Sequence, residues 1–179
     1  MAEGLLARRE ALKEAARKLA QSADGALMTR VHGDFHLGQV LVAQGDAVIV
    51  DFEGEPARTL EERRAKGSPL RDVAGLLRSL DYAAAAASSA LSTALPERRE
   101  TLLARFRSEA GAAFQAAYHE AEAASPVQWA PADTRDALLD LFLLEKASYE
   151  LRYEAANRPA WLSIPLRGLT ALADRLVTA

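Results

Sequence analysis

Apolar positions along the chain follow two different periods, which divide it into a helical majority and one short sheet. At the amino end, leucines and alanines recur near helical spacing until the polar stretch 22–25, which predicts one amphipathic helix over residues 3–21. From Leu70 onward the helical pattern returns, with three proline-containing interruptions. We predict four helices there, over residues 70–91, 97–123, 134–157 and 166–177.

Two short β-rich runs between these helical regions have a different pattern. Residues 39–44 and 47–52 are rich in valine and isoleucine, and Gly45-Asp46 separates them. A glycine beside an aspartate suits a tight two-residue turn, so we predict an antiparallel hairpin that turns there. Such a turn pairs Val42 with Ile49 and Val40 with Asp51. The charged run 61–66 that follows is expected to be a solvated loop or a short helix.

Composition excludes several classes of function. Lys plus Arg total 22 against 25 for Asp plus Glu, a net charge of -3, which gives no basic footprint for nucleic acid or an anionic membrane. The chain has no cysteine for a disulfide or a thiol site, and no apolar run long enough to span a membrane or serve as a signal peptide. We therefore expect a soluble, cytoplasmic single domain over residues 1–179 that binds a small molecule.

The chemistry-bearing residues gather around the predicted hairpin. Asp34 precedes Gln39 by five residues, the spacing between the catalytic base and the metal-binding amide in the catalytic loop of protein kinases. The hairpin then brings Asp51 beside Gln39, so that two hard oxygen ligands meet at its open end. A carboxylate after His-Gly is common in loops, and an Asp-Phe pair often only ends a strand. The loop, the hairpin and the motif at residues 51–54 together favour phosphoryl transfer.

Four segments resemble, in the same order, the corresponding segments of maltokinases, including the kinase modules fused to trehalose synthases. They are GDFHLGQVL, VDFEGEP, SPLRDVAGLLRSLDYAAAA and FLLEKASYELRYEAANRP. The resemblance runs from about Arg30 to Arg167. It implies a mostly α fold with a small β-hairpin, the C-terminal lobe of the protein-kinase-like (aminoglycoside phosphotransferase-like) fold. About thirty residues precede Asp34, so we expect the N-terminal nucleotide lobe to be absent.

The resemblance also implies roles for the loop and hairpin residues. Asp34 becomes the catalytic base, and Gln39 and Asp51 become ligands of Mg²⁺ with ATP as the phosphate donor. The wider superfamily usually has asparagine where this chain and the maltokinases have glutamine. Glu53 becomes a carboxylate beside the metal or the acceptor, and His32 holds the loop through hydrogen bonds.

Asp72 is a candidate support residue. In kinase-like lobes an acidic residue at this point braces the backbone of the catalytic loop. The alternative is a well-capped helix alone, with Ser68 as the cap and Pro69 in the first turn.

One face of the predicted helix 134–157 offers an acceptor site. Phe142, Lys146, Tyr149 and Tyr153 follow spacings of 4, 3 and 4, and therefore share that face. Aromatic rings beside a cation suit a sugar, and in maltokinases a comparable lysine and two tyrosines line the disaccharide pocket. The alternative is ordinary packing with a solvated pair between Lys146 and Glu150.

Other histidines and both tryptophans are left out of the site. Three histidines at this spacing make no zinc signature. His36 is expected to brace the loop and His119 to lie on the surface. Trp129 and Trp161 stand beside prolines, where an indole more often pins a loop.

The function implied by the resemblance is ATP-dependent phosphorylation of maltose to maltose 1-phosphate. The implied partners are maltose or a related sugar, and the missing N-terminal lobe or a fused trehalose synthase. Without that lobe the chain alone is expected to be inactive. Two alternatives stay open. One is an amino-sugar or aminoglycoside kinase of the same superfamily, which extra acids in the acceptor pocket would favour. The other is a non-catalytic C-terminal module of a trehalose synthase fusion.

Overall fold

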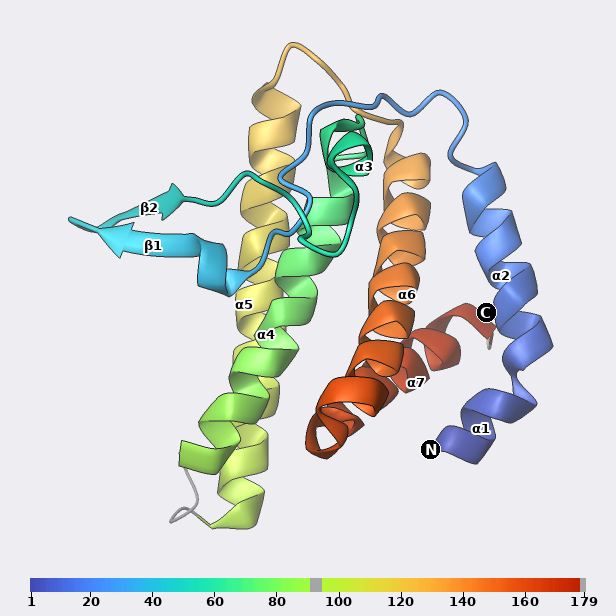
Figure 1. The fold of residues 1–179 in the computed structure, drawn as a ribbon, viewed down its shortest axis with the longest axis vertical. Helices are drawn as coiled ribbons and strands as arrows, with labels where there is room; N and C mark the ends of the chain where they lie inside the picture. The colour runs from blue at the N-terminus through green and yellow to red at the C-terminus, as the bar shows by residue number, and fades with distance from the viewer. Residues whose placement is uncertain (91–94, 178–179) are drawn as a thin grey trace. The chain divides into compact units, whose positions relative to one another are not determined.

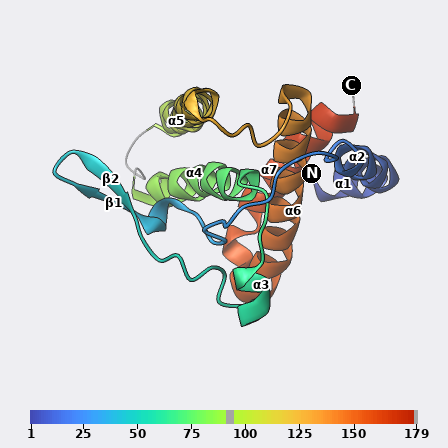
Figure 2. The same ribbon diagram turned by 90° about the horizontal axis from the view of Figure 1, so that it is seen from above.

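The computed structural model describes residues 1–90 and 95–177, and the chain forms two compact units. The central unit is Met28–Trp129, and the terminal unit combines Met1–Leu27 with Ala130–Ala179. Figures 1 and 2 show the helices and the hairpin that make up these units. That the whole chain acts as one lobe stays a prediction.

Two long antiparallel helices form the body of the central unit. Helix α4 (Leu70–Ala90) lies beside α5 (Pro96–Ala124) in both views. Their boundaries follow the sequence prediction closely, although Leu91, the predicted end of the first helix, lies outside the described residues. Buried apolar side chains lie on both helices and recur at helical spacing along α4. They are Leu70, Val73, Ala74, Leu76, Leu80, Ala84 and Leu103.

The hairpin is present, but its turn lies one residue earlier than predicted. Strand β1 (Val40–Ala43) pairs with β2 (Asp46–Ile49). The turn consists of Gln44 and Gly45, whose φ values of 55° and 85° are both positive, as a type I′ turn requires. A glycine at the second turn position therefore decides the register. The predicted pairs are wrong: Val40 pairs with Ile49, and Val42 with Ala47.

A short helix follows the hairpin in the central unit. Helix α3 (Leu60–Arg64) lies within the charged run, so the short-helix alternative is confirmed. Its first turn carries a capping box, in which the Thr59 side chain accepts from the Glu62 backbone and the Glu62 side chain accepts from the Thr59 backbone. This reciprocal pair explains how five residues form a defined helix.

The secondary-structure elements of the terminal unit are all helical within its described residues. It contains α1 (Ala2–Ala7), α2 (Arg9–Gln21), α6 (Ala132–Asn157), a 3₁₀ turn η2 (Pro159–Trp161) and α7 (Ser163–Val177). A buried cluster of Ala147, Leu169 and Leu172 joins α6 to α7. Helix α7 begins three residues before the predicted start at residue 166. Pro165 falls in its first turn, where backbone N–H groups make no hydrogen bond within the helix, so the missing N–H of proline does no harm there.

The predicted amino-terminal helix is interrupted, which corrects the expectation of one helix over residues 3–21. The break is at Arg8, with φ −96° and ψ 5°. The Arg8 side chain pairs with Asp174 of α7, and Leu5 packs against the buried cluster of α6 and α7. Neither α1 nor α2 contains a buried residue. No helix in the described ranges is long and apolar enough to cross a membrane.

Candidate functional site

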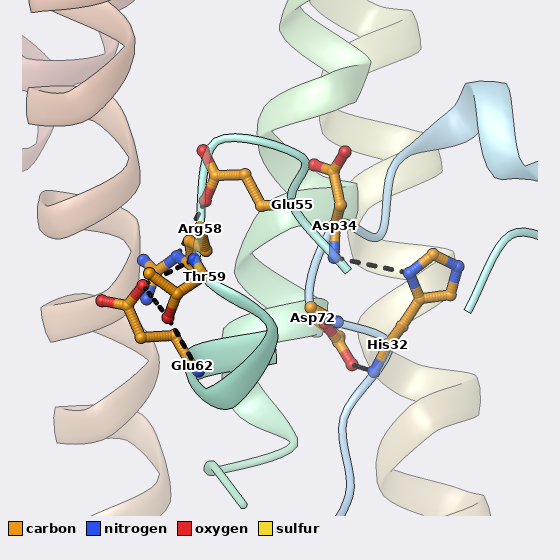
Figure 3. Close-up of polar contacts among 8 residues, drawn as sticks. His32, Asp34, Glu55, Arg58, Thr59, Glu62 and Asp72 are labelled. Carbon is orange, nitrogen blue, oxygen red and sulfur yellow. Dashed lines mark hydrogen bonds and ion pairs between the residues drawn. The ribbon is translucent and has the colours of Figure 1, made fainter. Parts of the chain in front are cut away.

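The loop that carries Asp34 is hydrogen-bonded to helix α4. One carboxylate oxygen of Asp72 accepts a hydrogen bond from the backbone N–H of His32 at 2.6 Å (Figure 3), and the other accepts one from the backbone N–H of Gly33 at 2.9 Å. Burial raises the pKa of Asp72 above its ordinary value, while these two backbone N–H groups act in the opposite direction. These are the contacts that a bracing role for Asp72 requires.

His32 connects the same loop to the end of the hairpin. Its ring is buried, and Nε2 lies 2.8 Å from the carbonyl oxygen of Val50, the residue before Asp51. The backbone N–H of Asp34 donates to Nδ1 at 3.4 Å, so a tautomer with hydrogen on Nε2 satisfies both ring nitrogens. The ring also contacts Phe52, at 4.9 Å between centroids. His32 therefore joins the segments on which Asp34 and Asp51 lie.

Two glycines allow these segments to touch. Gly33 has φ 86° and Gly54 has φ 79°, both in the left-handed region that favours glycine. A Cβ atom at Gly33 would lie 3.2 Å from the Cα of Gly54. The residue before Asp34 and the end of the Asp-Phe-Glu-Gly motif are thus in backbone contact.

Gln39 and Asp51 meet directly at the open end of the hairpin. Gln39 Nε2 donates to Asp51 Oδ2 at 2.9 Å, and the backbone N–H of Val50 donates to the Gln39 carbonyl at 3.0 Å. Asp51 has φ 65°, a conformation that costs a non-glycine residue about 1–3 kcal/mol and that recurs at active sites as well as in turns.

The donor set of Gln39 and Asp51 fits Mg²⁺. An amide oxygen and a carboxylate are hard ligands, and Mg²⁺ is usually bound by one or two carboxylates together with substrate phosphates. In the described part of the chain no group of three or more acidic, histidine or cysteine side chains could hold a metal alone. A metal bound by Gln39 and Asp51 would complete its coordination with water or with phosphate oxygens.

The segment after Asp51 is fastened to helix α3. Arg63 covers Gly54, donates to the Glu53 carbonyl at 3.5 Å and lies 4.0 Å from the Glu53 carboxylate, whose side chain is largely exposed. Glu55, by contrast, is mostly buried and forms an ion pair with Arg58 at 3.0 Å (Figure 3). Glu53 is thus the carboxylate of this segment that faces solvent.

The predicted acceptor residues form a row on α6, in the terminal unit. The rings of Tyr149 and Tyr153 are stacked, with centroids 6.3 Å apart and an interplanar angle of 21°. Lys146 Nζ lies 5.5 Å from the Tyr149 centroid, a cation–π contact. Asp34, Gln39 and Asp51 belong to the central unit, so a shared site with this row stays a prediction.

The row continues into residues that sequence reasoning left out. Arg158 lies over both the Tyr153 ring, at 5.3 Å, and the Trp161 ring, at 5.4 Å. The buried Glu154 fixes Arg158 through two hydrogen bonds of 2.9 and 2.6 Å. The i,i+4 spacing of this acid and base was the available signal.

Three small residues that support the loop were also missed. A Cβ atom at Gly75 of α4 would lie 2.5 Å from the Phe35 carbonyl oxygen, and one at Gly38 would lie 2.8 Å from the His36 ring. Ser79 of α4 accepts the backbone N–H of Leu37 at 3.1 Å. A lone glycine within a helical pattern was a signal for Gly75, whereas nothing in the pattern distinguished Ser79.

Comparison with known proteins agrees with the geometry of a kinase. No family model matches the chain. A glucosamine kinase of Mycolicibacterium smegmatis is 32% identical over 174 residues, which cover 96% of this chain and 41% of that protein. A glucosamine kinase of Streptacidiphilus jiangxiensis is 43% identical over 58 residues, 32% of this chain and 13% of that protein.

Solved structures give the same result. A glucosamine kinase in complex with glucosamine, ADP and inorganic phosphate has a TM-score of 0.69 and 28% identity, over 93% of this chain and 39% of that one. Another glucosamine kinase crystal form has a TM-score of 0.69 and 25% identity, over 97% of this chain and 47% of that one.

The chain resembles glucosamine kinases. Its homologues are sugar kinases with a kinase-like fold, which supports the kinase superfamily expected from the sequence, and the mostly helical fold with one two-stranded hairpin is confirmed. The chain spans less than half the length of these relatives. These relatives are named glucosamine kinases and do not support specificity for maltose, which stays a proposal.

Proposed function

We propose that the chain is the catalytic and acceptor-binding part of an ATP-dependent sugar kinase. The observation that supports this most is the contact of Gln39 with Asp51, beside a loop that Asp72 and His32 hold in place. The fold similarity to a glucosamine kinase solved with glucosamine, ADP and phosphate supports the same reaction class.

In the proposed reaction, Asp34 orients a sugar hydroxyl and accepts its proton while the hydroxyl oxygen bonds to the γ-phosphorus of ATP and ADP leaves. Gln39 and Asp51 would hold Mg²⁺, which supplies positive charge to the phosphates. Asp72 and His32 keep the loop fixed, so the Asp34 side chain does not have to be ordered during the reaction. Such positioning is most of what a protein contributes to phosphoryl transfer.

Glucosamine is the acceptor that we propose first, because the relatives that match the chain are glucosamine kinases. The exposed Glu53 carboxylate is a suitable partner for an ammonium group. Lys146, Tyr149 and Tyr153 are the proposed contacts for the sugar's hydroxyls and apolar face.

Maltose is the second candidate acceptor, with maltose 1-phosphate as the product. The two stacked tyrosine rings, Tyr149 and Tyr153, form an aromatic surface longer than one ring. Such a surface suits two linked glucose units, and the maltokinase-like segments of the sequence support the same choice. A non-catalytic role beside a trehalose synthase is the remaining alternative, which retention of Asp34, Gln39 and Asp51 opposes.

The hairpin supports a nucleotide-binding lobe as a partner. Its apolar side chains are exposed on both faces of the two-stranded sheet, which is unusual for a sheet surrounded by water. They are Leu41, Val42, Val48 and Ile49, with Phe52 just beyond the second strand. We propose that a lobe that binds ATP covers them, either in the same polypeptide or as a separate chain.

The test is a chimera of residues 1–179 with the part of the M. smegmatis relative that lies outside the matched region. ATP-dependent phosphorylation of glucosamine, maltose and glucose is followed by ADP release and by mass spectrometry of the product. We expect phosphorylation of glucosamine or maltose by the chimera and negligible turnover by residues 1–179 alone. A folded chimera that phosphorylates neither sugar, while the intact relative does under the same conditions, would contradict the proposal.

A further inference from the structure

Helix α4 presents three residues to the loop at helical spacing. Asp72, Gly75 and Ser79 are separated by three and four residues, so they lie on one face of the helix. Each meets a different part of the loop: the backbone N–H groups of residues 32–33, the carbonyl of residue 35 and the N–H of residue 37. The loop is therefore anchored at both ends and packed in the middle.

The Ser79 hydroxyl has a fixed orientation at the far end of this face. It donates to the carbonyl oxygen of Leu76, one turn earlier in α4, at 2.6 Å. With its hydrogen used in this way, the oxygen is left to accept the N–H of Leu37 at 3.1 Å. Alanine at this position would remove the acceptor and leave the helix intact.

The residue that Ser79 holds begins the 3₁₀ turn η1 (Leu37–Gln39). This turn is closed by two backbone hydrogen bonds, from Gln39 N–H to the His36 carbonyl at 2.9 Å and from Val40 N–H to the Leu37 carbonyl, and such short 3₁₀ turns are weakly held on their own. Its other end carries the Gln39 side chain that contacts Asp51. An anchor at the first residue of the turn therefore limits where the amide of the last residue can lie.

We propose that Ser79 is a positioning residue: by binding the N–H of Leu37, it orients the 3₁₀ turn and so sets the contact between Gln39 and Asp51. Its importance for catalysis rests on the proposed kinase function, because that function makes these two side chains the metal ligands. The positioning itself is a property of the chain and is measurable without turnover.

The experiment uses NMR on residues 1–179, with Ser79→Ala, Ser79→Thr and the matched control Ser88→Ala. Ser88 lies nine residues further along α4, about 13 Å along the helix axis. The readouts are hydrogen exchange of the Leu37 backbone amide, the chemical shift and exchange of the Gln39 side-chain amide, and broadening of the Gln39 and Asp51 signals by Mn²⁺ alone.

We expect Ser79→Ala to accelerate exchange at the Leu37 amide by roughly 10-fold, the scale of one lost hydrogen bond. The Gln39 side-chain amide should move toward its solvent-exposed shift, and the Mn²⁺ concentration for half-maximal broadening should rise several-fold. Ser79→Thr keeps the hydroxyl and should restore all three readouts, and Ser88→Ala should change none.

Two results distinguish failure of this inference from failure of the proposed function. If Ser79→Ala changes only the Leu37 amide and leaves the Gln39 side chain as in the wild type, Ser79 is a local support and the positioning role is overturned. If the Gln39 side chain responds but Mn²⁺ broadens no signal in the wild type, the positioning role is supported and the proposed metal site fails.

Discussion

The loop around Asp34 and the aromatic row on α6 are built in different ways. The loop is fixed mainly through backbone groups: two N–H groups bind Asp72, one binds Ser79, and a carbonyl packs against Gly75. The α6 row consists of side chains at helical spacing that contact one another, with Lys146, Tyr149, Tyr153 and Arg158 in sequence.

This difference indicates where each region tolerates change. A backbone held at several points moves as a unit, so a change in one supporting residue should reach Asp34 and Gln39 together. A row of side chains on a helix can lose one member without displacing the helix. We therefore expect substitutions at the loop to affect chemistry and stability, and substitutions on α6 to affect mainly sugar affinity.

The largest effect is expected from Asp34→Asn in the active chimera. The amide cannot accept the hydroxyl proton, so kcat should fall by roughly 100-fold or more, while KM for the sugar stays near its original value. Steady-state kinetics with sugar and ATP varied separately, plus a thermal melt, measure this. Asp24→Asn, at an exposed position near the end of α2, is the matched control. A folded Asp34→Asn enzyme with near-normal kcat would end the assignment of Asp34 as base.

The second prediction compares two glycines within helices. Gly75→Ala should lower the free energy of unfolding by about 1–3 kcal/mol, because the added methyl would meet the Phe35 carbonyl oxygen at 2.5 Å. Gly111→Ala on α5 would place its methyl 3.7 Å from the Leu77 side chain, an ordinary contact, and should leave stability the same or raise it through helix propensity.

Urea unfolding of residues 1–179 and both variants measures this difference. Equal stabilities for Gly75→Ala and Gly111→Ala would show that the loop retreats from α4 at little cost. The loop would then not be rigidly supported by α4, and it would not differ from the α6 row in the way described above.

The sequence predicted the parts of the molecule that follow a period or a motif. The long helices, the hairpin and the approach of Gln39 to Asp51 came from hydrophobic spacing and from the kinase-like motif. The contact between Gln39 and Asp51 is present although the predicted register was wrong. Both residues lie just outside the strands, at the open end of the hairpin, where a shift in register leaves them close to each other.

Features that depend on tertiary contacts were not predicted. The break at Arg8 coincides with an ion pair to Asp174, which is distant in sequence, and the turn at Gln44 uses a residue type with no preference for positive φ. Gly75 and Ser79 act on backbone atoms of a loop some forty residues earlier. No local pattern records such a contact.

On the α6 side, Tyr149→Ala should raise KM for the sugar by about 10-fold, or about 1.4 kcal/mol, and leave most of kcat. The ring contacts are expected to be similar in the ground and transition states. Tyr149→Phe keeps the stacked ring and should stay within a few-fold of the wild type. Kinetics of the chimera with glucosamine and maltose test both. An unchanged KM in Tyr149→Ala for both sugars would assign this face of α6 to packing.

The smallest effect concerns Asp72 and the pH dependence of stability. Burial raises its pKa in the folded state above 3.8, so protonation favours folding. The stability contributed by protonated Asp72 is complete at pH values below its pKa in the unfolded chain. It is lost as pH rises through its higher pKa in the folded protein. Asp72→Asn and Asp72→Ala cannot ionise. Relative to both variants, the wild type should therefore lose stability as pH rises from about 3 toward 7.

Urea unfolding of residues 1–179 at several pH values measures this relative slope, which each variant should share despite its own constant offset. The constant offset in the free energy of unfolding measures the loss of the hydrogen bonds between Asp72 and the backbone of His32 and Gly33. The change of that free energy with pH measures ionisation alone. A wild type that instead gains stability relative to both variants as pH rises would show that the two backbone N–H groups outweigh burial. The carboxylate would then be bound by the loop as an anion, and the loop support would be strongest at neutral pH.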